Sequence, residues 1–349
     1  MSGEYRVAIH KNDKVFKHSS LWDSVWIAYC KKNNIPFDVI DCYHPDTVQV
    51  LKDYNYLLWH LGSFTANSFY MGMATMNVAR GLGVSVFPNY ETAWHFDDKI
   101  SEAMLLKSVK APMPKSWAFF VLDECMDWLN RFDQFPLVAK LKCGSGSNNV
   151  KLLHNHEEAV QYAKQMFLKG IKPNNSVTFK AMSNLRSSKD LQMIKARIKR
   201  IPDFLGKLRA AKSLSVESGY VLFQEFIPNN GYDLKVVVVG DKLSFIVRHT
   251  RKGDFRASGG GSIEYDKAYV PQNVIDSAFK LSDSLGFQCM GYDYVIDKCD
   301  GIGKVIEISY GFSHTALMQS GGYWDRDAIW HDEPLNAPEE ILKNLLKRE

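Results

Sequence analysis

The first part of the chain alternates between short apolar runs and stretches in which apolar residues recur at helical spacing. The runs predict strands and the spaced stretches predict helices. The predicted strands are residues 5–10, 37–40, 56–60 and 84–88, and the predicted helices are residues 21–33, 47–53 and 69–81. Strands and helices that alternate at this length predict a parallel, doubly wound sheet.

Such a sheet binds its ligands at the carboxyl ends of its strands. His60, Ser63 and Asn67 lie just after the third predicted strand. They are therefore candidate substrate contacts, although a polar loop with no ligand is an equally good interpretation. No G-x-G-x-x-G follows the first strand, which argues against a dinucleotide-binding dehydrogenase.

The remainder of the chain mixes strands and helices without this simple alternation. A helix is expected over residues 91–109. A strand ends at Lys140 and returns at residues 150–153, so the glycine-rich segment 143–149 is predicted to be the tip of a hairpin. The other predicted helices are residues 123–132, 157–168, 275–285 and 339–347, and the other strands are residues 116–120, 220–223, 234–239, 243–248, 290–297 and 304–309.

Composition is that of a globular protein. The 349 residues, 46% of them hydrophobic, suffice for two or three domains. No apolar window is long enough to cross a bilayer and the first residues lack a signal-peptide pattern, so a cytoplasmic protein is expected. The six cysteines are scattered, which is typical of reduced thiols. Cys143 lies in the glycine-rich segment, where a small loop residue is a better interpretation than a nucleophile.

The charge is concentrated in one segment. The whole chain carries a net charge of +4, whereas residues 180–212 contain ten Lys or Arg and two acidic residues. This segment is expected to be a mostly helical insertion, bent at Pro202. It is either a solvated face or a surface for a polyanion, an acidic glycan or a membrane face. No nucleic acid is predicted as a partner.

Two acidic residues interrupt apolar, β-rich runs late in the chain. Asp293 lies within residues 290–297 and Glu307 within residues 304–309. An unpaired carboxylate in such a segment costs several kcal/mol. Two carboxylates on adjacent strands are explained if they share a cation, and oxygen ligands favour Mg²⁺. The alternative is a pair of carboxylates that face water at the ends of the strands.

A strand that ends in Lys140, a glycine-rich loop, a Gln-Glu-Phe-Ile segment at residues 224–227 and the late acidic pair follow one another along the chain. This order resembles the ATP-grasp superfamily over roughly residues 90–325. The resemblance is to its carboxylate–amine ligases, and the chain is similar to ribosomal-protein glutamate ligases and D-alanine–D-alanine ligases. A looser similarity, through Tyr323-Trp324-Asp325 and Trp330-His331, is to members associated with cell-surface polysaccharide synthesis.

The resemblance implies an α/β and α+β fold, in which a doubly wound parallel-sheet domain precedes a two-lobed ATP-grasp fold. Four regions are then expected. They are an N-terminal domain at residues 1–95, a lobe A at residues 96–223 with the basic insertion 180–212, a lobe B with the metal site at residues 224–335, and a C-terminal helix at residues 336–349.

The resemblance also assigns roles to single residues. Lys99 and Lys140 match lysines that reach the ATP phosphates, and Arg248 and Arg256 match arginines that hold the acyl phosphate. Ser309 stands where the family usually has asparagine, the third metal ligand, and is the clearest departure. The nucleotide-binding positions are Lys99, Lys140, Gly144, Ser145, Gly146, Ser147, Gln224, Glu225, Phe226, Ile227, Asp233 and Lys235, and the metal-binding positions are Asp293, Glu307 and Ser309.

The implied cofactors are ATP and Mg²⁺, with Mn²⁺ as an alternative. In this match residues 225–227 meet the adenine edge, Asp233 meets the ribose hydroxyls, and Lys235 stands where the ribosomal-protein glutamate ligases often have arginine.

The implied activity is an ADP-forming ligase that activates a carboxylate as an acyl phosphate and joins it to an amine. The substrate is expected to be a small molecule, a glycan or an amino acid. Two alternatives stay open: an ATP-grasp kinase that phosphorylates a hydroxyl, and a nucleotide-binding protein without catalysis. Neither the identity of the substrates, nor the choice between amide, thioester and phosphate ester, nor the presence of a homodimer follows from the sequence.

Overall fold

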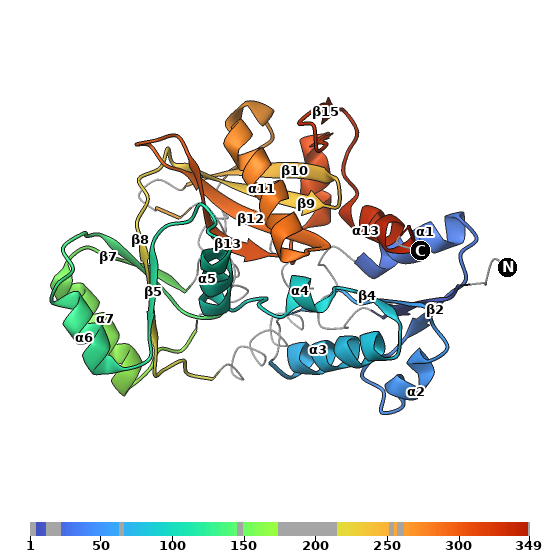
Figure 1. Cartoon of the computed structure of the whole chain (residues 1–349), viewed down its shortest axis with the longest axis horizontal. Coiled ribbons are helices and arrows are strands. Elements are labelled where there is room, and N and C mark those ends of the chain that lie inside the picture. Colours follow the sequence, from blue (N-terminus) through green and yellow to red (C-terminus); the bar gives the residue numbers. More distant parts are fainter. Residues whose placement is uncertain are drawn as a thin grey trace, which may run out of the picture.

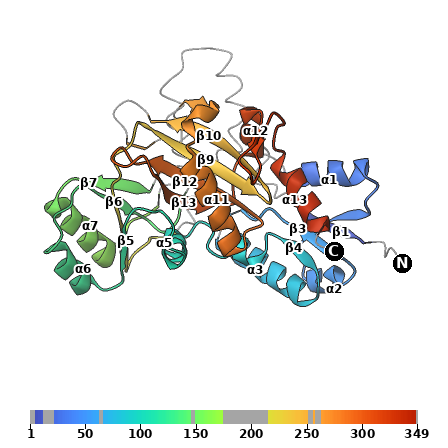
Figure 2. The ribbon, with the colours of Figure 1, turned by 45° about the horizontal axis from the view of Figure 1, so that its top comes forward.

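The computed structural model describes residues 5–11, 22–62, 66–144, 149–173, 215–250, 255–256 and 262–347, and for residues 66–68 the backbone alone. Three sheets lie side by side along the length of the molecule (Figures 1 and 2). The N-terminal sheet lies at one end, the largest sheet lies in the middle, and a small antiparallel sheet lies at the other end. No helix within these ranges is long and apolar enough to cross a membrane.

The N-terminal sheet is parallel and has the strand order β2-β1-β3-β4. Its strands are β1 (Val7–His10), β2 (Phe37–Ile40), β3 (Tyr56–Leu58) and β4 (Ser85–Phe87), and its helices are α1 (Trp22–Lys32), α2 (Thr47–Leu51) and α3 (Ala66–Gly81). Helix α1 lies on one face of the sheet, and α2 and α3 lie on the other (Figure 1). The expectation of a doubly wound parallel sheet is confirmed.

The prediction of one helix over residues 91–109 is wrong. The structure has two helices there, α4 (Tyr90–Ala93) and α5 (Lys99–Ser108). Between them Asp97 adopts a φ of +60°, and the Asp98 carboxylate accepts hydrogen bonds from the backbone N–H groups of Ile100 and Ser101. Aspartate tolerates the left-handed conformation and caps helix N-termini well, so this pair ends one helix and begins the next. The break places Lys99 in the first turn of α5.

The small sheet is antiparallel and has the order β5-β8-β6-β7. Its elements are β5 (Ser116–Phe119), α6 (Leu122–Leu129), β6 (Leu137–Lys140), β7 (Val150–Leu153), α7 (His156–Leu168) and β8 (Val221–Glu225). Strands β6 and β7 form the predicted hairpin. We call this region lobe A. The basic insertion predicted at residues 180–212 lies outside the described residues.

The largest sheet has the order β13-β12-β9-β10-β14-β15, with β11 paired to β10, and we call this region lobe B. Its strands are β9 (Tyr232–Val239), β10 (Lys242–His249), β11 (Ile263–Glu264), β12 (Cys289–Ile296), β13 (Gly303–Ser309), β14 (Tyr323–Trp324) and β15 (Trp330–His331). The helical elements are η2 (Lys267–Tyr269), α11 (Gln272–Leu285), α12 (His314–Leu317), η3 (Met318–Ser320) and α13 (Ala337–Leu346).

The C-terminal helix α13 returns to the N-terminal domain and lies beside α1 in both views (Figures 1 and 2). The indole N–H of Trp26 in α1 donates to the Pro338 carbonyl oxygen at 2.8 Å. The N-terminal sheet and lobe B share one continuous hydrophobic core, whereas lobe A has a core of its own. The boundary between these two cores is therefore the natural place for a cleft.

Candidate active site

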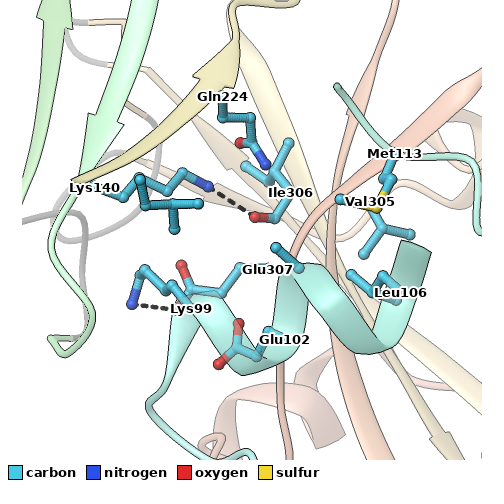
Figure 3. A pocket seen from close by; sticks show the side chains of 11 residues that line it. Lys99, Glu102, Leu106, Met113, Lys140, Gln224, Val305, Ile306 and Glu307 are labelled. Carbon is cyan, nitrogen blue, oxygen red and sulfur yellow. Dashed lines mark hydrogen bonds and ion pairs between the residues drawn. The ribbon is translucent and has the colours of Figure 1, made fainter. Parts of the chain in front are cut away.

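A small cleft lies between lobe A and the rest of the molecule. Lys99 and Glu102 enter it from α5, Lys140 from β6, Gln224 from β8 and Glu307 from β13 (Figure 3). Four of the residues predicted to bind nucleotide or metal are thus brought together here by elements far apart in the sequence.

Lys140 crosses the boundary between the two cores. Its ammonium Nζ donates to the carbonyl oxygen of Ile306 in β13 at 2.8 Å (Figure 3). The side chain is buried, and this burial lowers the pKa of Lys140 to about 8, because the opposing attraction of Glu307 offsets only part of it. A lysine held in this way is a strong partner for an incoming anion, since its charge is poorly compensated.

Lys99 connects α5 to the glycine-rich segment. Its Nζ donates to the Gly144 carbonyl oxygen at 2.8 Å and lies 3.4 Å from an oxygen of Glu307. Burial alone would lower the pKa of Lys99, but the carboxylates of Glu307, Glu102 and Asp97 outweigh burial and hold this pKa above its ordinary value. Lys99 is therefore a cation held beside Gly144, at the start of the glycine-rich segment.

The rest of the predicted phosphate loop lies outside the described residues. This applies to Ser145, Gly146 and Ser147, whose roles stay predictions. Gly144 is described: its φ is +115°, and its N–H donates to the Asp97 carboxylate at 2.8 Å. Gly144 thus has a backbone conformation that a residue with a side chain adopts rarely.

Glu102 is a site residue that the sequence analysis missed. Its side chain lines the cleft beside Glu307, and one of its oxygens accepts a 3.4 Å hydrogen bond from the Ile308 N–H (Figure 3). Burial, together with the charge of Glu307, raises the pKa of Glu102 well above its ordinary value. One signal was present: residues 99, 102 and 106 lie on one helix face, so an acidic residue occupies an inward position of α5.

The two carboxylates predicted to bind metal are direct cross-strand neighbours. Asp293 in β12 pairs with Glu307 in β13, and the register shifts just after Asp293. The Asp293 carboxylate lies 2.5 Å from the Lys235 ammonium and 3.0 Å from the Arg248 guanidinium. Burial would raise the pKa of Asp293, but Arg248 and Lys235 outweigh burial and lower it to about 2. The lowered pKa keeps Asp293 ionised.

This arrangement fits a divalent cation through its donor chemistry. Asp293 and Glu307 present carboxylate oxygens from adjacent strands, and Mg²⁺ prefers such ligands. Within the described ranges no group of three or more His, Cys, Asp or Glu side chains is gathered as a ligand set. The Ser309 hydroxyl is engaged nearby, where it accepts a hydrogen bond from the Gly311 N–H at 3.1 Å. The two carboxylates are thus the core of the candidate metal site.

Asp233, predicted to bind ribose, is buried in a charged row on the same sheet. It pairs across the strands with Arg248, whose Nε lies 2.5 Å from its carboxylate. Burial raises the pKa of Asp233 to about 6 despite the opposing effect of Arg248. Arg248 therefore bridges Asp233 and Asp293, which places one predicted catalytic residue directly beside the candidate metal ligands.

The predicted adenine segment begins at the edge of the cleft. The Gln224 amide lines the cleft and donates to the Ser116 hydroxyl at 3.1 Å. The backbone N–H of Glu225 donates to the Lys115 carbonyl oxygen at 2.8 Å, and the Glu225 carboxylate accepts from the Lys115 N–H at 3.1 Å. Residues 115 and 116 thus hold the end of β8 in place.

The second predicted arginine lies near the same segment rather than beside Asp293. The Arg256 guanidinium lies over the ring of Phe255, 5.9 Å from its centroid. The Phe255 ring makes an edge contact with the Phe226 ring, with 6.2 Å between their centroids. Ile227, the residue after Phe226, is buried. Arg248 and Arg256 therefore lie in different surroundings.

Two histidines meet a tryptophan where the N-terminal domain contacts lobe B. The His60 ring stacks on Trp22 at 4.1 Å, and His314 makes an edge contact with Trp22 at 6.2 Å. Within the described ranges His60 Nε2, His314 Nδ1 and Trp22 Nε1 have no hydrogen-bond partner. Burial, with the charge of His314, lowers the pKa of His60 to about 3. Ser63 and the Asn67 side chain, predicted with His60, lie outside the described structure.

No protein-family model and no curated protein matches the sequence. Solved structures do match the fold. D-alanine–D-alanine ligase from Bacillus anthracis matches at a TM-score of 0.57 and 15% identity, over 98% of each chain. A RimK domain ATP-grasp protein from Sphaerobacter thermophilus matches at a TM-score of 0.54 and 16% identity, over 98% of this chain and 99% of that one.

D-cycloserine synthetase matches at a TM-score of 0.55 and 13% identity, over 98% of this chain and 99% of that one. These three structures each match this chain over nearly its whole length. The chain therefore has the fold of the ATP-grasp ligases, as its sequence motifs predicted.

Proposed function

We propose that the protein is an ATP-dependent ligase that activates a carboxylate as an acyl phosphate and joins it to an amine. One observation carries the proposal. Two buried lysines, Lys99 and Lys140, line the cleft of an ATP-grasp fold together with Glu307, whose cross-strand neighbour is Asp293. Among the similar structures, one was solved with ATP and another with Mg and ADP.

Each group has a task in this chemistry. ATP carries close to four negative charges, so Lys99 and Lys140 would neutralise its phosphates. Asp293 and Glu307 would hold Mg²⁺, which supplies further charge neutralisation at the phosphate oxygens when bound. Arg248, beside Asp293, presents a planar fork that suits a phosphate group. Residues 225–227 would meet the adenine edge.

The reaction balances in two steps. A carboxylate oxygen of the substrate attacks the γ-phosphorus of ATP, and ADP leaves. An amine then attacks the carbonyl carbon of the acyl phosphate, loses a proton, and inorganic phosphate leaves. Trp22, His60 and His314 are candidate contacts for a substrate, because their polar atoms have no hydrogen-bond partner among the described residues. A small-molecule or glycan carboxylate is the substrate class we propose.

The release of ADP and phosphate tests the proposal. The protein is incubated with MgATP and a panel of carboxylic acids, each with and without amines, and a Glu307→Gln variant serves as the control. Release of both ADP and phosphate that requires an acid and an amine together supports the ligase. ADP release with phosphate retained on a hydroxyl product indicates a kinase. ATP binding without any turnover indicates a nucleotide-binding protein without catalysis.

A further inference from the structure

Three successive backbone N–H groups at the start of the glycine-rich segment point to carboxylates from other parts of the chain. Lys142 N–H donates to one oxygen of Glu217 at 3.0 Å and also to the Tyr220 hydroxyl at 2.6 Å, and Cys143 N–H donates to the other Glu217 oxygen at 3.4 Å. The next donor, Gly144 N–H, reaches Asp97 at 2.8 Å. The base of the loop is therefore fixed by two acidic side chains, of which Glu217 is 75 residues away from Lys142 in sequence.

Glu217 receives two further donors. The Cys143 thiol donates to one of its oxygens and the Tyr220 hydroxyl donates to the other. Burial raises the pKa of the Cys143 thiol to about 12, and the bond to Glu217 adds to this effect. The thiol is thus a protonated donor that anchors the loop. A carboxylate with four donors is well satisfied, and the loss of one acceptor oxygen takes this partner from two of the donors.

The backbone of Glu217 is itself held rigidly within lobe A. Its N–H and carbonyl oxygen exchange hydrogen bonds with Ile171, at 3.0 and 2.8 Å. Gly170 lies alongside with a φ of +72°, and a Cβ at this position would stand 2.7 Å from the Glu217 carbonyl oxygen. Glycine is required for this close approach. Glu217 therefore belongs to the rigid part of lobe A, just before β8, and pairs with Ile171, which follows α7.

We infer that Glu217 is a positioning residue for nucleotide phosphates, because it fixes residues 142–144 so that the Gly144 carbonyl oxygen holds the Lys99 ammonium. The inference rests on the proposed function. The Lys99 Nζ lies 2.8 Å from that oxygen, so a displaced Gly144 also displaces the cation. Because the base of the loop is already ordered, nucleotide binding does not carry the entropic cost of ordering it.

Two variants of Glu217 and one matched control test this inference. Glu217→Gln keeps the shape but replaces one acceptor oxygen with an NH₂ group, and Glu217→Ala removes both oxygens. Tyr220→Phe keeps the carboxylate but removes one donor to it, together with an acceptor of the Lys142 N–H. Glu124→Gln, an exposed glutamate on α6 of the same lobe, is the control. Calorimetry measures the affinities for MgATP, MgADP and adenosine, and hydrogen exchange measures the protection of the backbone amides of residues 142–144.

Both Glu217 variants are expected to bind MgATP and MgADP about tenfold more weakly and to keep their affinity for adenosine within about twofold, because the loop base acts on phosphates alone. Amide exchange at residues 142–144 should accelerate. Tyr220→Phe should show a milder change of the same kind, and it serves as the test if Glu217→Ala fails to fold.

Three results would overturn the inference. Unchanged ATP and ADP affinities refute it while the proposed function stands. Equal losses for ATP and adenosine, accompanied by a lower melting temperature, show a purely structural role. A wild-type chain that binds no nucleotide refutes the proposed function and the inference with it, and this outcome is recognised without any variant.

Discussion

The replacement of Lys140 by methionine should separate the stability of the chain from its affinity for nucleotide. The Lys140 side chain is buried, with 6% exposed, and its ammonium has the Ile306 carbonyl oxygen as its hydrogen-bond acceptor at 2.8 Å. Methionine is of similar length, carries no charge and adapts to irregular buried positions. We expect Lys140→Met to unfold less readily than the wild type and to bind ATP more weakly.

The size of the stability effect follows from the pKa of Lys140. A pKa that falls from its ordinary 10.5 in the unfolded chain to about 8 in the folded chain costs about 3 kcal/mol of stability below pH 8. The lost hydrogen bond to Ile306 removes about 1 kcal/mol, so the net gain at pH 7 is about 2 kcal/mol. The unfolded chain binds this proton more tightly than the folded chain does. Wild-type stability therefore rises between pH 8 and pH 10.5, and the advantage of the variant disappears over that range.

Denaturant unfolding at pH 7 and pH 9.5 measures the stability effect, and calorimetric titration with MgATP at pH 7 measures the binding effect. The free-energy difference between variant and wild type should shift by about 2 kcal/mol in favour of the wild type at the higher pH. ATP affinity should fall at least about tenfold, because a desolvated charge-assisted contact contributes about 1.5–3 kcal/mol.

Lys151→Met, at an exposed position of β7 in the same sheet, is the control and should alter stability by less than about 0.5 kcal/mol. The reasoning is refuted if Lys140→Met is less stable than the wild type by the same amount at both pH values. Unchanged ATP affinity in a folded variant would place Lys140 outside the nucleotide site.

Four further predictions concern the metal, the buried acid and the basic insertion. Glu307→Gln should abolish turnover and leave the circular dichroism spectrum unchanged, because a neutral amide cannot balance a divalent cation. Ser309→Asn should preserve or raise Mg²⁺ affinity in a calorimetric titration; a total loss would mean that the bond from Gly311 N–H is essential. The raised pKa of Glu102 means that the folded wild type keeps this proton while the unfolded chain releases it above about pH 4.5, so wild-type stability falls as the pH rises. Glu102→Gln should therefore gain stability over the wild type above about pH 4.5 in unfolding experiments. Neutralising four cations of the insertion should raise the KM of a polyanionic acceptor and flatten its salt dependence, with ATP parameters unchanged, since such attraction is screened over about 8 Å. An acceptor KM that stays constant at low and high salt would make the insertion a solvated face. The four cations are Lys195, Arg197, Lys199 and Arg200.

Features set by local pattern could be predicted from the sequence. The alternation of apolar runs and helical spacing predicted the parallel N-terminal sheet. The strand that ends at Lys140 and its return at residues 150–153 predicted the β6–β7 hairpin. The adjacency of Asp293 and Glu307 was also predicted, and the structure shows them in direct register. In each case the information lies within a short stretch of chain or in two consecutive strands.

Features set by contacts between distant segments could not be predicted. The bond from Lys140 to the Ile306 carbonyl oxygen joins positions 166 residues apart, and a carbonyl acceptor leaves no mark on the sequence. The contacts of Glu217 with the loop base are equally remote. The break at Asp97 was missed for another reason: helical spacing continues across it, and the capping of α5 by Asp98 outweighs that periodicity.

The ionisable groups that line the cleft together suit it to a polyphosphate. Lys99 and Lys140 stand against Glu102 and Glu307, a set that looks balanced when it is simply counted (Figure 3). Burial and the charge of Glu307 raise the pKa of Glu102 and so favour its neutral form. The raised pKa of Glu102 shifts the balance of charge in the cleft toward the two cations, which is the sign that a polyphosphate requires. Glu102 thus accepts a hydrogen bond from the Ile308 N–H, while its raised pKa limits the negative charge that it adds beside Glu307.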